Sequence, residues 1–234
     1  MSRADTGHDR ERDRIRMAKL PQLRHWIVLP LVFAALIVGA GLALRTPALT
    51  AADLAVDVEL GHDRWAPLTG IALFLDVVFS PAGGMAMIAG LCLILLVVCR
   101  SPINAVATGV VAVAGWVSSE LFKVLVARQR PDPSGLFDPL SSERGTDSFP
   151  SGHTALAVAL AIAVFLLARG TRWQWPTLLA SAGVAVAVAL SRVYLGVHYA
   201  TDVASSFVTP LTGQRSSRVF GTPTGSRLWR ASQS

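Results

Sequence analysis

The sequence predicts an all-α fold, a polytopic bundle of transmembrane helices, on three observations. First, 52% of the 234 residues are hydrophobic and only 15% are charged, whereas a soluble domain carries roughly 25% charged residues. Second, the charged residues avoid several windows that are long enough to span a bilayer. Third, these windows are apolar on all sides, and a soluble domain would have to bury each of them completely.

The first apolar window follows a polar tail. Residues 1–24 are dense in both basic and acidic side chains and indicate a polar cytoplasmic tail. The first span is expected at residues 26–44. Its apolar run exceeds the roughly 7–15 residues of a signal-peptide core, so we interpret it as an uncleaved anchor. Residues 45–69 are mixed and acidic, and they predict an external loop with an interfacial helix.

A half-helix is expected before the second span. Residues 71–79 are apolar but contain Asp76, and they end at Ser80-Pro81. Asp76 is either a functional intramembrane acid or a residue near the membrane interface, and we favour the interfacial interpretation. The second to fifth spans are expected at residues 82–99, 103–126, 151–168 and 177–195.

The sequence therefore predicts five clear spans and a sixth that is doubtful or truncated. Residues 203–213 are short, rich in hydroxyl groups and broken by Pro210. The tail at residues 212–234 carries four arginines and no acidic residue. We divide the chain into the tail at 1–24, one membrane domain at 25–211 and a polar, basic C-terminal tail at 212–234.

The distribution of basic residues predicts the orientation. The N-terminal tail, Arg100 and the turn at residues 169–172 are expected in the cytoplasm, because Lys and Arg favour that side. Alternation then places the loops at 45–69 and 127–150, and the end of the fifth span, on the extracytoplasmic face of the cell (inner) membrane. The net charge of +6 fits this orientation better than nucleic-acid binding.

Three polar clusters fall at the extracytoplasmic ends of the predicted spans. One of them opens a helix with a histidine, where unpaired backbone N–H groups and the positive end of the helix dipole favour an anion. Together the clusters hold three cations, two imidazoles and one carboxylate, which make an anion site capable of acid–base chemistry. The candidate residues are Lys123, Arg130, Ser151, Gly152, His153, Arg192, His198 and Asp202.

Each candidate also has an ordinary structural explanation. Lys123 can pair with Glu120 one turn earlier, and Arg192 can anchor the membrane edge. His198 and Asp202 can form a pair four residues apart on a helix. Each explanation is the better one for a single residue, but the shared location of all the clusters favours a site.

The spacing of these clusters resembles the three-part signature of the type 2 phosphatidic acid phosphatase superfamily. The match spans about residues 123–202 and agrees in residue type, spacing and order, and the preceding spans are similar to that family's six-helix membrane form. The matching segments are Lys123-x6-Arg130-Pro131, Pro150-Ser151-Gly152-His153 and Ser191-Arg192-x5-His198-x3-Asp202.

The resemblance implies three catalytic residues. His198 is expected to attack phosphorus and form a phosphohistidine. Asp202 is expected to accept the other ring N–H and fix the tautomer. His153 is expected to protonate the leaving oxygen and then to activate water.

The resemblance also implies a phosphate-binding set without a metal. Lys123, Arg130 and Arg192 are expected to bind the phosphoryl oxygens, and Ser151 and the Gly152 N–H to complete the cradle. We expect no metal and no other cofactor, because the sequence has no clustered carboxylates for magnesium and no Cys/His set for zinc.

The location of the site favours a lipid substrate. The family implies undecaprenyl or another polyprenyl diphosphate, phosphatidic acid or phosphatidylglycerol phosphate, and an outward-facing site suits recycling of a polyprenyl carrier. Three alternatives remain: a lipid-binding or lipid-moving protein with a vestigial site, a vanadate-dependent haloperoxidase, which is a soluble protein, and a structural membrane subunit. The unusual C-terminus also predicts weak or absent activity.

Overall fold

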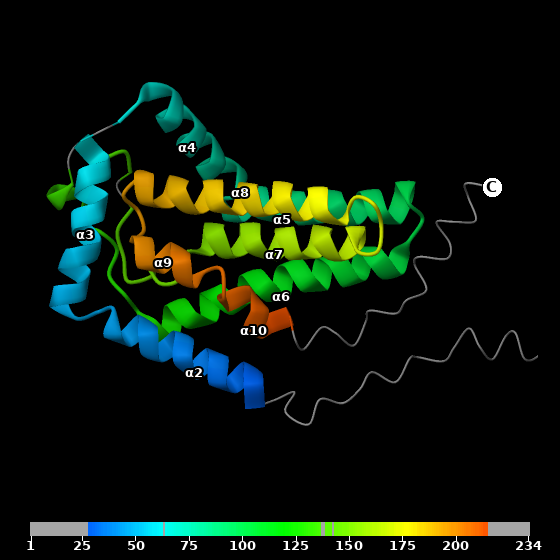
Figure 1. Cartoon of the computed structure of the whole chain (residues 1–234), viewed down its shortest axis with the longest axis horizontal. Coiled ribbons are helices and arrows are strands. Elements are labelled where there is room, and N and C mark those ends of the chain that lie inside the picture. Colours follow the sequence, from blue (N-terminus) through cyan, green and yellow to red (C-terminus); the bar gives the residue numbers. More distant parts are fainter. Residues whose placement is uncertain (1–27, 63, 137–138, 142, 215–234) are drawn as a thin grey trace, which may run out of the picture.

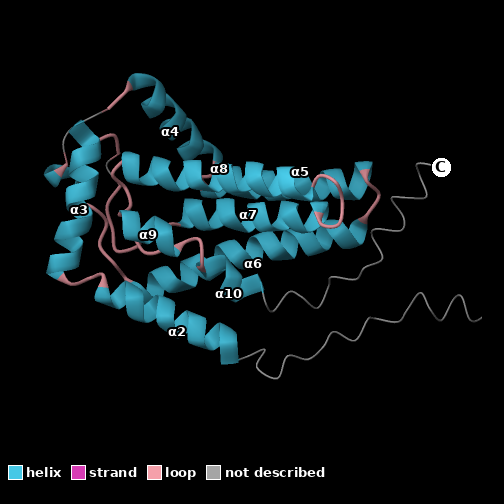
Figure 2. Ribbon diagram, viewed as in Figure 1, coloured by secondary structure: helices cyan, strands magenta, loops and turns pink. Residues whose placement is uncertain are grey.

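The computed structural model describes residues 28–62, 64–136, 139–141 and 143–214. Every regular element in these ranges is a helix, as Figure 2 shows, so the predicted all-α class is confirmed. The two predicted polar tails, 1–24 and most of 212–234, lie outside the described residues.

The long helices form the body of the bundle. They are α5 (Pro81–Leu93), continued by the π-helical turn η1 (Ile94–Val98), then α6 (Pro102–Val126), α7 (Gly152–Ala168) and α8 (Gln174–Tyr194). In Figure 1, α7 runs between α6 and α8, and both neighbours pack against it. The positions of the second to fifth predicted spans therefore match observed helices.

The core lies around α7. Buried apolar side chains of α5, α6 and α8 meet those of α7, and Leu156 is fully buried among them. A methyl group added at Gly84 on α5 would lie only 2.3 Å from Leu156 Cδ2. Glycine at this position therefore permits the close approach of α5 to α7.

The outer surfaces of the bundle are apolar. On α6, Leu121 is 60% exposed and Val124 is 79% exposed, and on α8, Leu179 is 72% exposed. Exposed apolar surface of this extent marks contact with another apolar phase, which here is lipid. By length and composition, three described helices can cross a membrane, or four if a bent pair counts as one span. This number is lower than the five spans predicted, partly because α7 has 17 residues.

The N-terminal helices wrap one end of the bundle. Helix α2 (Val28–Ala43) is followed by α3 (Pro47–His62) at a bend of 83°, and α3 crosses the end of the bundle in Figure 1. The predicted half-helix is α4 (Ala66–Val78), which starts five residues earlier than expected. It ends before Ser80, whose hydroxyl caps α5 by accepting from the Gly83 N–H.

Two short helices replace a sixth span in the described residues. These are α9 (Ala200–Ser205) and α10 (Thr209–Gln214). Helix α10 packs against α6 and α2, and the Ser118 hydroxyl on α6 donates to the Thr209 carbonyl at 3.2 Å. The break at Pro210 that the sequence predicts is therefore the start of a new helical turn rather than the end of the fold.

The two ends of the bundle differ in character. The short turns around Arg100 and at residues 169–173 lie at one end. The described parts of the loop at 127–151, the segment at 195–199 and α3 lie at the other end, on the left in Figure 1. All three polar clusters thus lie at a single end of the bundle, as the predicted alternation requires.

Candidate active site

Backbone hydrogen bonds join the two arms of the loop between α6 and α7. Helix α6 ends at Val126, and its C-cap residue Ala127 has a left-handed φ of 47°. Beyond it, the Ser148 N–H donates to the Arg128 carbonyl at 3.1 Å, and the Arg130 N–H donates to the Gly145 carbonyl at 3.0 Å. These bonds join the two arms of the loop and bring the first and second polar clusters together.

The start of α7 forms the predicted cradle. Ser151 is the N-cap residue and is fully buried, and Gly152 and His153 open the helix. A methyl group added at Gly152 would lie 3.0 Å from Lys123 Nζ, so the lysine ammonium lies against the helix N-terminus. Lys123 also pairs with Glu120 at 2.9 Å. The ordinary pairing predicted for Lys123 therefore occurs, and its phosphate-binding role stays a prediction.

The ring of His198 is held by a carbonyl group. Its Nδ1 lies 2.7 Å from the Ser148 carbonyl oxygen, whereas Asp202 Oδ2 lies 3.8 Å away. The sequence-based expectation that Asp202 accepts the ring N–H is therefore wrong in this conformation, because 3.8 Å exceeds hydrogen-bonding distance. Asp202 is linked to the ring through Ser148, since its Oδ2 accepts from the Ser148 hydroxyl at 2.5 Å.

The burial of the His198 ring favours an uncharged imidazole. His198 is 1% exposed, and this burial lowers the pKa of its ring to about 4, helped by the positive charges of Arg130 and Arg192. The pKa of Asp202 is also lowered, because the hydrogen bonding and positive charge around the carboxylate outweigh its burial. The pair is therefore neutral imidazole and carboxylate anion near neutral pH.

An ion-pair chain links the second and third predicted cations. Arg130 binds both oxygens of Asp147, at 2.8 and 3.0 Å, and lowers the pKa of that carboxyl to about 2. Glu143 then bridges Arg130, at 2.5 Å, and Arg192, at 3.5 Å. Arg130 also donates to the carbonyl of Val197 at 3.2 Å, directly before His198.

Asp76 extends this chain to the second histidine. Its Oδ1 pairs with Arg192 Nη1 and lies 3.3 Å from His153 Nε2. Helix α4 thus brings this carboxylate into contact with two of the candidate site residues, a contact that the interfacial interpretation of Asp76 did not include. A single oxygen that contacts both an arginine and a histidine occupies a position that a phosphoryl oxygen would suit.

The candidate residues thus form two connected groups. Arg130, Arg192 and His153 share the ion-pair chain, while His198 and Asp202 share contacts with Ser148. Ser151 and Gly152 lie at the helix start beside Lys123. The catalytic and phosphate-binding roles of these residues stay predictions.

Sequence reasoning missed several residues around the site. Arg128 is buried and pairs with Asp202, yet in the sequence it resembles another loop arginine. Ser148 directly precedes the Phe149 of the histidine motif, and that position is its only signal. Glu143 and Asp147 lie in a polar loop without periodicity, so nothing in the sequence singles them out.

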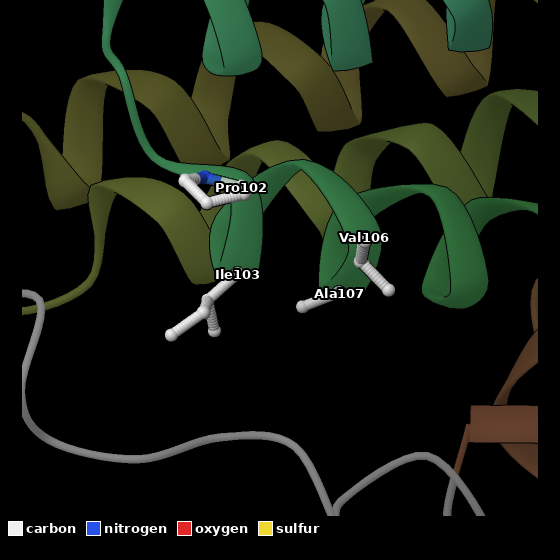
Figure 3. A pocket seen from close by; sticks show the side chains of 4 residues that line it. All are labelled: Pro102, Ile103, Val106 and Ala107. Carbon is white, nitrogen blue, oxygen red and sulfur yellow. The ribbon is translucent and has the colours of Figure 1, made fainter.

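The surface of the described residues includes two shallow depressions. One lies at the start of α6, at the opposite end of the bundle, and is lined by Pro102, Ile103, Val106 and Ala107 (Figure 3). The other lies in the site loop and includes Arg130. Within the described ranges, no group of three His, Cys, Asp or Glu side chains is placed to bind a metal. The expectation of metal-free chemistry stays a prediction.

Comparisons with known proteins agree on one family. The family model of the PAP2 superfamily matches residues 103–211. An undecaprenyl-diphosphatase from Sulfolobus acidocaldarius is 31% identical over 169 residues, which cover 67% of this chain and 74% of that protein. Phosphatidylglycerophosphatase B from Bacillus subtilis is 38% identical over 38% of this chain and 44% of its own length. The chain spans only about a quarter to a half of the first curated relatives that it matches.

A solved structure has the same fold. The transmembrane PAP2-type phosphatidylglycerolphosphate phosphatase from Bacillus subtilis superposes with a TM-score of 0.69. The match covers 82% of this chain and 94% of that chain at 23% sequence identity. The bundle described above is therefore the transmembrane fold of that enzyme class.

Proposed function

This chain belongs to the membrane lipid phosphatase branch of the PAP2 superfamily, and we propose that it hydrolyses a polyprenyl diphosphate or another lipid phosphate through a phosphohistidine intermediate. One observation carries the mechanism: His198 Nδ1 lies 2.7 Å from a carbonyl oxygen. A carbonyl can only accept, so the proton of the neutral ring is on Nδ1. The lone pair of Nε2 is then available for attack.

The first chemical step transfers the phosphoryl group to the protein. His198 Nε2 forms a bond to phosphorus while the bond from phosphorus to the leaving oxygen breaks. His153 gives its proton to that oxygen, so the lipid leaves as an alcohol or a monophosphate. Arg130 and Arg192 stabilise the charge that develops on the phosphoryl oxygens.

The second step releases phosphate. His153, now neutral, takes a proton from a water molecule, and the water oxygen attacks phosphorus. The bond between phosphorus and Nε2 of His198 breaks, which restores the neutral imidazole. Inorganic phosphate leaves, and both histidines return to their starting states.

The cation set supports an anionic substrate, which competes with the carboxylates of Glu120, Glu143, Asp147 and Asp76 that pair with these cations in the structure. Lys123, Arg130 and Arg192 supply three positive charges, and Ser151 and Gly152 add the N-terminal end of a helix. The undecaprenyl-diphosphatase relative, which is matched over 74% of its length, supports a diphosphate. The phosphatidylglycerophosphatase relative supports a phospholipid monophosphate as the second candidate.

The alternatives are weaker on specific grounds. A haloperoxidase of the soluble kind does not fit the exposed apolar surfaces of α6 and α8. A lipid-moving protein with a vestigial site does not require the tautomer of His198 to be fixed. Substitution of His198 separates this possibility from an enzyme, because it stops hydrolysis but leaves transport unchanged.

The test is a phosphate-release assay on the full chain in detergent or nanodiscs with EDTA present. The panel holds undecaprenyl diphosphate, phosphatidic acid and phosphatidylglycerol phosphate. We expect release from the diphosphate, loss of release in H198A, and no loss in H8A, which changes a histidine of the polar tail. Release that persists in H198A, or that EDTA abolishes, overturns the proposal.

A further inference from the structure

We propose that Arg128 is a positioning residue for the nucleophile: it holds both groups that orient the His198 ring. This inference rests on the function proposed above. Arg128 belongs to neither the cation set nor the histidine pair, and it lies between the lysine and the arginine of the first cluster. Its position in the fold, rather than its place in a motif, carries the argument.

The guanidinium of Arg128 is enclosed and almost fully bonded. It is 1% exposed. Its Nη1 donates to Asp202 Oδ1 at 2.5 Å and to Thr201 Oγ1 at 2.8 Å, and its Nη2 donates to Asp53 Oδ2 at 2.8 Å. Its Cζ atom lies 4.2 Å from the centre of the Tyr199 ring. Such a fork of donors fixes a carboxylate in direction as well as in distance.

The backbone of Arg128 reaches the second support of the ring. The Arg128 carbonyl accepts from the Ser148 N–H at 3.1 Å. Ser148 in turn accepts from His198 with its carbonyl and donates to Asp202 with its hydroxyl. The side chain and the main chain of one residue therefore hold the carboxylate and the carbonyl that face His198.

The charge balance makes this arginine necessary. Asp202 is fully buried, and α3 places two more buried acidic side chains nearby, of which Asp53 is a direct ion-pair partner of Arg128 and Asp57 is not. Neither oxygen of Asp57 has a hydrogen-bond partner among the described residues. Without Arg128 the buried Asp202 loses its direct cationic partner and gains affinity for a proton. The charged and titratable groups that face Asp202 are Arg128, Arg130, His198, Tyr199, Asp53 and Asp57.

The same arginine connects α3 to the site. Asp53 lies on α3, which crosses the end of the bundle in Figure 1, and it also accepts from the Thr201 hydroxyl at 2.5 Å. The arrangement of α3 is thereby tied to Asp202 through a single guanidinium. Removing the Asp53 charge should disturb the nucleophile less than removing Arg128, because the contact with Asp202 remains.

The test compares R128M with R128K, D53N and the control R144M, which changes an exposed arginine of the same loop. We expect R128M to lower kcat by about 10²-fold with little change in KM, since misorientation of a reacting group has costs of this order. As the pH is lowered, the kcat/KM of R128M should also begin to fall at a higher pH than that of the wild type, because Asp202 is protonated more readily. R128K should restore the pH profile and part of kcat, D53N should lose about tenfold or less, and R144M should be unchanged.

The outcomes separate the two proposals. A wild-type chain that releases no phosphate from any lipid of the panel overturns both. An active wild type whose folded R128M and R128K variants keep its kcat and pH profile overturns the role of Arg128 alone. If R128M yields no folded protein, R128K and D53N decide: unchanged pH profiles with unchanged kcat overturn the inference.

Discussion

The Ser148 carbonyl oxygen lies 2.7 Å from Nδ1 of His198, 1.1 Å closer to the ring than the nearest oxygen of Asp202 at 3.8 Å. The candidate nucleophile is therefore oriented by the main chain, and the carboxylate orients the residue that supplies this carbonyl. Backbone atoms cannot be removed by side-chain substitution, so the tautomer of His198 should survive the loss of Asp202.

Replacing Asp202 by asparagine should damage the enzyme less than the same change does in a serine protease triad. There the carboxylate alone sets the tautomer, and the loss is about 10⁴-fold in kcat. Here the carbonyl keeps the Nδ1 proton in place, so we expect a loss of about 10²-fold. Steady-state phosphate release by D202N measures it, and a loss as large as that of H198A would contradict the backbone role.

Asp76 should compete with the substrate phosphate. Its carboxylate already contacts Arg192 and His153, so an incoming phosphoryl oxygen must displace it. We expect D76N to bind vanadate or inorganic phosphate about ten- to a hundredfold more tightly, because charged hydrogen bonds are worth about 1.5–3 kcal/mol and about 1.4 kcal/mol is a factor of ten in affinity. Equilibrium binding measures this without turnover. E59Q on α3 removes an exposed carboxylate as the control, and weaker anion binding in D76N would refute the competition.

The folded protein should lose stability as the pH falls through the weakly acidic range. Burial lowers the pKa of His198 from 6.5 to about 4. Between these values the unfolded chain binds a proton at His198 that the folded chain does not, so the free energy of unfolding decreases as the pH falls. Thermal unfolding in one detergent at about pH 7 and about pH 5 should show a smaller decrease for H198N than for the wild type. Equal decreases would mean that His198 is not buried as a neutral ring.

The C-terminal helices should limit activity if the expectation of an impaired site is right. Helices α9 and α10 have six residues each in the place of a longer span. A variant in which an apolar helix of about 20 residues follows residue 205 should give more folded protein and a higher kcat. A matched variant with a polar insert of the same length is the control. Equal yields and equal rates for wild type and apolar variant would show that the short helices suffice.

The helix pattern could be predicted because it depends on composition alone. Long apolar windows punctuated by Arg100-Ser101-Pro102 and the turn at 169–172 predict helix ends to within a few residues. The break between α2 and α3 was also predicted, since the first span was expected to end at residue 44 and the loop at 45–69 to hold an interfacial helix. The angle of 83° between the two helices was not. Ile37, Val126 and Phe149 share a buried cluster that packs α2 against the bundle, and such contacts are not visible in a single sequence.

The sequence predicts which residues gather at the candidate site, but it does not predict their hydrogen-bond and ion-pair partners. The types and spacing of Arg130, His153 and Arg192 were sufficient to bring them together. The partners of these residues were not, because Asp76 and Glu143 reach the site from α4 and from an irregular loop. Arg128 was missed because burial, which distinguishes it from Arg144, is decided by the folded loop rather than by the local sequence.

The contact between Gly84 and Leu156 has a consequence for genetics. Leu156 lies one turn beyond His153 on the same helix, so a side chain at position 84 would push on the segment that carries the proton donor. A random screen for loss of phosphate release should therefore recover substitutions such as G84V, deep among apolar residues. Such variants would be mistaken for folding defects unless the yield of folded protein were measured together with its rate of phosphate release.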